Sequence, residues 1–286
     1  MNKRYFWLAC WLGLFSAHTL AQDNVIRVND SSDPNGPHAV KMIELALKHI
    51  DKKYKLVVTK EPYSQVKIME EVNNGNLEAF WNSSNAEKEV NFTPIRICLY
   101  KGLLGNRLFI INKNNQSKFD GVKTLEDLKK ITIGQGKTWA DTKILESNGL
   151  KVVKANKYES LFFMVEGGRF DAFSRGVHEP FGELANHPNL KDLTVEKHLM
   201  LVYRMPFYLF VGKNNKALAK DLEDGLNRAI ADGTFDQVFF ADPSVQDVMA
   251  KADMKNRHAI YLDNPTLSKE TPLDRKELWF DPKTIP

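Results

Sequence analysis

Residues 124–184 read TLEDLKKITIGQGKTWADTKILESNGLKVVKANKYESLFFMVEGGRFDAFSRGVHEPFGEL. This stretch contains two short apolar strands, 131–133 and 170–173, and each leads into a corner with polar or charged groups at its tip. In an open α/β sheet, ligands bind outside the carboxyl ends of the strands. We therefore expect both corners to face one crevice that holds a small molecule.

The same order of elements recurs on either side of this stretch. Before it, the apolar and β-branched segments 24–29, 55–59 and 77–81 alternate with helical patterns, which predicts a βαβαβ unit with a parallel sheet. After it, 206–212 is typical of a buried strand, and leucines and isoleucine spaced by four predict a helix over 216–231. No low-complexity linker separates the units, so we expect two α/β lobes that share strands.

The first 21 residues have the pattern of a secretory signal peptide. Lys3 and Arg4 form a basic start, and the apolar run 5–15 is too short to span a bilayer. Thr19 and Ala21 are small residues at the positions expected before a cleavage site. An uncleaved membrane anchor is the alternative. We expect cleavage near Ala21 and a periplasmic protein.

Composition and charge narrow the class of protein further. The chain has 286 residues, of which 43% are hydrophobic and 27% charged, as in one large or two modest globular domains. Loss of Lys3 and Arg4 lowers the formal net charge from +4 to +2, which is too small to predict nucleic-acid binding. Cys98 alone remains after cleavage and predicts a buried, inert thiol with no internal disulfide.

The segment Gly136-Lys137-Thr138 is a candidate anion site. A nucleotide-binding phosphate loop needs a glycine five positions before the Gly-Lys pair, where this chain has Ile131. A glycine-rich turn that opens a helix still presents backbone N–H groups and a positive dipole end to an anion. We therefore predict ligand contacts from Thr138 and Trp139, although a plain turn is the alternative.

Five further residues complete the predicted ligand site. Arg175 follows the strand at 170–173, and its fork can bind a carboxylate through two hydrogen bonds. A structural ion pair with Glu179 is an equal alternative. Trp81, Asn82 and Ser83 end the strand at 77–81, where the Trp either walls a ligand or covers the core. We predict an acidic ligand group held by Thr138 and Arg175.

The sequence carries no positive signal for catalysis, a metal or a cofactor. It has no HExxH motif and no cysteine pair, and His178 and Glu179 are adjacent rather than one helical turn apart. It has no GxSxG nucleophile elbow. We therefore expect a protein that binds without catalysis, with no cofactor and no metal.

Three weak motifs occur together in a specific order: 133–138 (IGQGKT), 168–172 (GRFDA) and 231–235 (ADGTF). With this order the chain resembles the family 3 bacterial extracellular solute-binding proteins, the type II periplasmic binding proteins of amino-acid importers. The resemblance implies a two-lobed α/β fold, each lobe a mostly parallel sheet flanked by helices. It implies lobe 1 from 22–103 and 207–286, and lobe 2 from 104–206, after the signal peptide 1–21.

The resemblance also implies a site between the lobes. The turn matched by Thr138 and Trp139 would hold a ligand carboxylate, and an acidic residue after the strand that contains Asp171 would hold an ammonium group. This chain carries Arg175 and then Glu179 there, and the family's carboxylate-binding arginine has no clean match, Lys88 being the nearest basic residue. A ligand with more than one acidic group, or another polar molecule, becomes plausible.

Three hypotheses for function follow. The first is a solute-binding protein of the periplasm that delivers an amino acid or small organic acid to an inner-membrane ABC permease. The second is a sensory protein that passes its closed state to a receptor. The third is an enzyme on the same scaffold, as in the cyclohexadienyl dehydratase-like proteins, with Glu179 as candidate acid. We expect a monomer in each case.

A first prediction concerns export. Because of the basic start, the short apolar run and the small residues at Thr19 and Ala21, cleavage is expected after Ala21. Mass spectrometry of a periplasmic extract should find a mature N-terminus at or within a few residues of Gln22. A full-length chain retained in the inner membrane would contradict the prediction.

Overall fold

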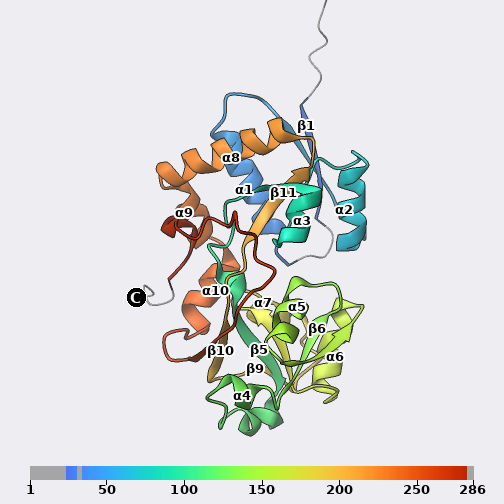
Figure 1. Ribbon diagram of the computed structural model, residues 1–286, viewed down its shortest axis with the longest axis vertical. Coiled ribbons are helices and arrows are strands. Elements are labelled where there is room, and N and C mark those ends of the chain that lie inside the picture. The colour runs from blue at the N-terminus through green and yellow to red at the C-terminus, as the bar shows by residue number, and fades with distance from the viewer. Residues whose placement is uncertain (1–23, 31–33, 282–286) are drawn as a thin grey trace, which may run out of the picture.

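The chain folds into two lobes of mixed α/β structure with sheets flanked by helices, which confirms the predicted fold class (Figure 1). The computed structural model describes residues 24–30 and 34–281. The predicted signal peptide 1–21 lies outside the described residues. Within the described part, no helix is long and apolar enough to cross a membrane.

The first lobe lies in the upper half of Figure 1 and contains α1 and α8, which pack against each other. Strands β1 and β2 pair in parallel, while β11 pairs antiparallel with both β3 and β4. Its elements are β1 (Val25–Asn29), α1 (Gly36–Lys48), β2 (Lys55–Thr59), α2 (Gln65–Asn73), β3 (Ala79–Ser83), α3 (Ala86–Asn91), β4 (Phe92–Ile95), β11 (Phe207–Gly212), α8 (Lys216–Ala231) and α9 (Thr234–Phe240).

The second lobe is built on a sheet of order β12-β10-β5-β8-β6-β7, with β9 paired to β5. Strands β6, β7 and β8 are parallel, as predicted, whereas β5 runs antiparallel to β8 and β10. The elements are η1 (Leu103–Gly105), β5 (Asn106–Asn112), η2 (Lys113–Lys118), α4 (Leu125–Leu128), β6 (Thr132–Gly136), α5 (Ala140–Ser147), β7 (Lys151–Ala155), α6 (Tyr158–Glu166), β8 (Ala172–Gly176), α7 (Pro180–Asn186), β9 (Leu193–Val195) and β10 (Leu199–Val202).

Local signals in the sequence account for several element ends. Ser64 begins α2 by accepting a hydrogen bond from the Lys67 backbone N–H. Thr124 and Asp127 form a reciprocal capping box at α4. Helix α8 buries the leucine stripe that its spacing predicted.

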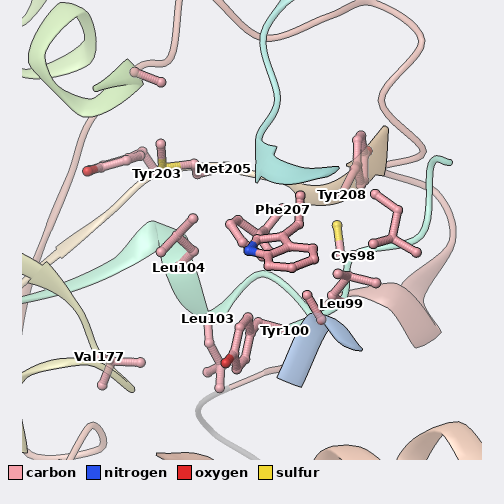
Figure 2. Packing of buried hydrophobic residues seen from close by; sticks show 14 of the residues in the cluster. Cys98, Leu99, Tyr100, Leu103, Leu104, Val177, Tyr203, Met205, Phe207 and Tyr208 are labelled. Carbon is pink, nitrogen blue, oxygen red and sulfur yellow. The ribbon is translucent and has the colours of Figure 1, made fainter. Parts of the chain in front are cut away.

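Two chain segments cross between the lobes, and their apolar side chains form a shared buried cluster (Figure 2). The first crossing contributes Cys98, Leu99 and Tyr100, and the second contributes Tyr203 and Phe207. The two segments are joined by backbone hydrogen bonds from Tyr203 to Gly105 and from Leu99 to Phe207. Cys98 is buried, as predicted, and burial raises the pKa of its thiol to about 12, which favours the unreactive protonated form.

The C-terminal part of the chain contacts both lobes and the crossing segments. After α10 (Pro243–Lys251), strand β12 (His258–Tyr261) pairs with β10 and so joins the second sheet. Further on, the Ala86 N–H donates to the Thr266 carbonyl, and after η3 (Lys276–Leu278) the Phe280 N–H donates to the Lys101 carbonyl. The division into lobe 1 (22–103 and 207–286) and lobe 2 (104–206) stays a proposal. In this division β12 belongs to lobe 1 by sequence but pairs with the sheet of lobe 2.

A second prediction concerns the close packing of α1 and α8. A Cβ atom added at Gly225 would lie 2.2 Å from the Ala46 backbone carbonyl oxygen, so Gly225→Ala should destabilise the protein by about 1–3 kcal/mol. Gly182 of α7 offers a matched control, because a Cβ there meets nothing within 4 Å. Urea unfolding should show a loss for Gly225→Ala only; equal stability of the two variants would contradict this packing.

Candidate functional site

A cavity of about 210 Å³ lies between the two lobes. The first lobe contributes the ends of β1 and β3 and the start of α2, and the second contributes β5, β8 and the starts of α5, α6 and α7. It is lined by Asn29, Pro34, Asn35, Tyr63, Ser64, Gln65, Ile68, Phe80, Trp81, Asn82, Ser83, Leu104, Arg107, Trp139, Asp141, Tyr158, Arg175, Glu179 and Phe207.

The structure brings six of the seven predicted site residues to this cavity. Trp81, Asn82 and Ser83 lie on the carboxyl end of β3 and line it from the first lobe; Trp139, Arg175 and Glu179 line it from the second. Thr138 is exposed and does not line the cavity. That these residues contact a ligand stays a prediction.

The predicted glycine-rich turn is part of a strand. Gly134 and Gly136 lie in β6, and the turn that follows is at Lys137 and Thr138. A Cβ at Gly134 would lie 2.1 Å from the Phe170 ring, and one at Gly136 would lie 2.4 Å from the Trp139 ring. The glycines therefore make room for aromatic side chains that pack on the strand, which explains their spacing without an anion.

Arg175 lies inside β8 rather than after the strand, because β8 extends to Gly176 through its pairing with β5. Its Nε donates to both carboxylate oxygens of Glu183 at 2.9 Å, and its Nη2 lies 3.0 Å from Glu179 Oε1. The three side chains are buried. The alternative of a structural ion pair with Glu179 is therefore confirmed, and Glu183 is a second partner that the sequence analysis missed.

Arg107 is a second buried arginine at the cavity, and sequence analysis did not identify it. Its Nη1 lies 3.3 Å from Asp141 Oδ1 and donates to the Leu104 carbonyl at 3.1 Å, and its Nη2 donates to the Ser174 carbonyl at 2.9 Å. The Tyr203 hydroxyl donates to the same Asp141 oxygen. Arg107 thus has partners from three segments that meet at the lobe boundary.

Lys88 lies at the edge of the site without lining it. Its Nζ donates to Asn82 Oδ1 at 2.9 Å and to the Ser83 carbonyl at 2.5 Å. Burial lowers the pKa of Lys88 to about 8, against the opposing effect of the Asp141 carboxylate. The ammonium group is therefore held by the cavity wall itself.

Aromatic rings form much of the remaining wall. They come from both lobes, and one of them, Tyr158, also donates its hydroxyl proton to Glu183 Oε1 at 2.7 Å. The Arg175 guanidinium lies 4.9 Å from the Trp139 ring centroid and 5.4 Å from that of Tyr158. The rings that line the cavity are Tyr63, Phe80, Trp81, Trp139, Tyr158 and Phe207.

One polar contact ties the lobes together beside the cavity. Asn35 of the first lobe donates from Nδ2 to Glu179 Oε1 at 3.2 Å, and its Oδ1 lies 2.9 Å from His178 Nε2. The His178 ring stacks on Tyr100 of the first crossing segment, with centroids 4.1 Å apart. Burial lowers the pKa of His178 to about 4, despite the nearby Glu179 charge.

Comparison with known proteins shows the fold. No protein family and no curated protein matches the sequence. A Salmonella typhimurium periplasmic binding protein with high arginine specificity matches at 15% identity and a TM-score of 0.54, over 76% of this chain and 97% of that one. The chain therefore shares the fold of this periplasmic binding protein.

Two other solved structures match equally well and widen the range of functions on this fold. An ancestral amino acid-binding protein, a precursor of cyclohexadienyl dehydratase, matches at 16% identity with a TM-score of 0.55, over 76% of this chain and 94% of that one. A histidine kinase sensor domain matches at 11% identity with a TM-score of 0.57 and the same coverage of 76% and 94%. The structural neighbours of this chain therefore include amino-acid-binding proteins and a sensor domain.

A third prediction concerns His178 and pH. Its folded-state pKa of about 4 lies below the ordinary value of 6.5, so the unfolded chain binds a proton first and stability should fall as pH drops from 6.5 to 4. The group contributes a loss of about 2–4 kcal/mol over that window. Urea unfolding at several pH values should show a flatter dependence for His178→Gln. The exposed His198→Gln serves as control; a slope unchanged by His178→Gln would refute the assignment.

Proposed function

We propose that this chain is a periplasmic solute-binding protein that captures a small polar solute between its lobes. The observation that carries the proposal is the cavity, which side chains of both lobes line at the carboxyl ends of β1, β3 and β8. A ligand there would contact both lobes at once, so its binding energy would favour the closed arrangement. The periplasmic-binding-protein fold supports the same conclusion.

The partner in this proposal is an inner-membrane ABC permease that receives the solute. Export through the predicted signal peptide would place the chain in the periplasm. A receptor is the alternative partner, which the likeness to a histidine kinase sensor domain supports. Purification of the protein with its membrane partner would distinguish the two.

A binding role fits the site better than a catalytic one. Burial would raise the pKa of Glu179, but the Arg175 and Arg107 charges outweigh burial and hold that pKa below its usual range. A general acid must carry a proton near the working pH. Glu179 is ionised there and also accepts the Gly176 N–H at 2.6 Å. It is therefore a poor candidate for the acid of a dehydratase.

The experiment for this function is a thermal-shift screen of the mature protein with amino acids, amines and small organic acids. A solute that binds only the folded state must raise the melting temperature. Small-angle scattering with the best solute should then show compaction of the molecule. No shift with any solute in the panel would argue against a solute-binding role.

A fourth prediction concerns Trp81 as a wall of the cavity. Trp81→Ala should weaken binding of the solute found in the screen by about 10- to 100-fold, because it removes a large buried contact surface. Phe163→Ala is a matched control, since that aromatic side chain is exposed on α6 and does not line the cavity. Calorimetric titration gives both affinities. An unchanged affinity in folded Trp81→Ala protein would place the ligand elsewhere.

A further inference from the structure

Arg175 lines the cavity, but the Nε–Nη2 edge of its guanidinium group faces protein carboxylates. Nε and Nη2 donate to Glu183, at 2.9 Å and 2.5 Å, and Nη2 also lies 3.0 Å from Glu179. Glu183 does not line this cavity and approaches Arg175 from its far side, on α7. The Nε–Nη2 edge, one of the two edges through which a guanidinium can bind a carboxylate by two parallel bonds, is therefore occupied by Glu183.

The charges around Arg175 disfavour a ligand anion. Two buried carboxylates, Glu179 and Glu183, lie against this one guanidinium, so its positive charge is compensated within the protein. Arg107 is also engaged by protein groups, because Asp141, the Leu104 carbonyl and Ser174 are partners of its Nε, Nη1 and Nη2 groups. An acidic ligand that used the Nε–Nη2 edge of Arg175 would have to displace Glu183.

Asn29, which lines the cavity from the first lobe, favours a hydrogen-bond donor on the ligand. The Thr59 hydroxyl donates its one proton to the Val28 carbonyl, at 3.2 Å, so it must accept from Asn29 Nδ2, at 3.0 Å. This fixes the orientation of the amide. Asn29 Oδ1 is then a buried acceptor at the cavity wall that has no partner among the described residues. A ligand N–H or O–H group would satisfy it.

Lys88, which contacts the cavity-lining residues Asn82 and Ser83, does not restore an anion site. Two of its three donors are directed to Asn82 Oδ1 and the Ser83 carbonyl, and its side chain is not part of the cavity lining. The aromatic wall, with Trp81 and Trp139, suits an apolar or planar body and stabilises positive charge through the ring faces.

We propose that the cavity binds an amine. Such a ligand has a cationic or neutral donor group and an apolar or planar body, and it places no acidic group at Arg175. In this proposal Glu183 determines the specificity, because it neutralises Arg175 from behind the cavity wall. The inference rests on the proposed function and specifies the ligand class of the same cavity. It replaces the sequence-based prediction that Thr138 and Arg175 anchor an acidic group.

Matched ligands that differ only by a carboxylate test this proposal directly. The probes are arginine with agmatine, lysine with cadaverine, and phenylalanine with phenethylamine, measured by thermal shift and calorimetric titration. Wild-type protein should bind the amine of at least one pair more tightly than its amino acid. Glu183→Gln should shift that ratio toward the amino acid by about tenfold or more, because Arg175 becomes free to make a charge-assisted bond.

Glu159→Gln is the matched control. It removes the same charge in the same isosteric way one residue after Tyr158, but the Glu159 side chain is exposed and pairs with His187 rather than Arg175. Its ratio of amine to amino-acid affinity should equal that of the wild type. An equal shift in both variants would mean that overall charge, not Glu183, sets the preference, and would overturn the proposal.

Two further outcomes overturn the ligand class. One is tighter wild-type binding of every amino acid than of its amine, and the other is no binding of any of the three amines. If Glu183→Gln does not fold, the wild-type ranking of the pairs decides the question. The proposed function survives either result as long as another solute of the screen binds and Trp81→Ala weakens that binding.

Discussion

A guanidinium group buried in a protein requires a carboxylate partner, and this requirement organises the space between the lobes. Leaving such a charge unpaired costs several kcal/mol, roughly 3–5 when one partner of a buried pair is lost. Arg175 takes Glu179 and Glu183 from the corner and helix that follow its own strand, and Arg107 takes Asp141 from the first turn of α5. The direction of α7 and the position of α5 at the cavity depend on these pairs.

The ion pairs also reach across the lobe boundary. Glu179 accepts from Asn35 of the first lobe, and His178, beside it in the chain, contacts the same amide and stacks on Tyr100. Glu179 therefore both pairs with Arg175 and contacts the first lobe. A change in the charge at Arg175 would act on both the cavity and the contact between the lobes.

The sequence was sufficient where the signals are local, since strand 55–59 and helix 216–231 occur with the predicted bounds. The strand predicted at 170–173 instead spans 172–176, because Phe170 packs its ring over Gly134 and is not part of the ladder. The site was predicted only in part, from the polar residues at the ends of strands. Arg107 and Asp141 were missed because their pairing is non-local and each lies inside an element. Whether Arg175 faces a ligand or Glu183 depended on the course of α7 after Pro180, which no local pattern encodes.

The C-terminal segment adds a constraint to any motion of the lobes. Its backbone is bonded to the first lobe at Ala86, to the second through β12, and to the first crossing segment at Lys101. At that crossing Gly102 has a positive φ of 76°, and the Trp279 ring occupies the space where a Cβ would lie, 2.6 Å from its nearest atom. A rotation about the crossing segments must therefore carry this segment along or break its bonds to one lobe. The Asn35 contacts to Glu179 and His178 resist separation of the lobes together with the bonds of this segment.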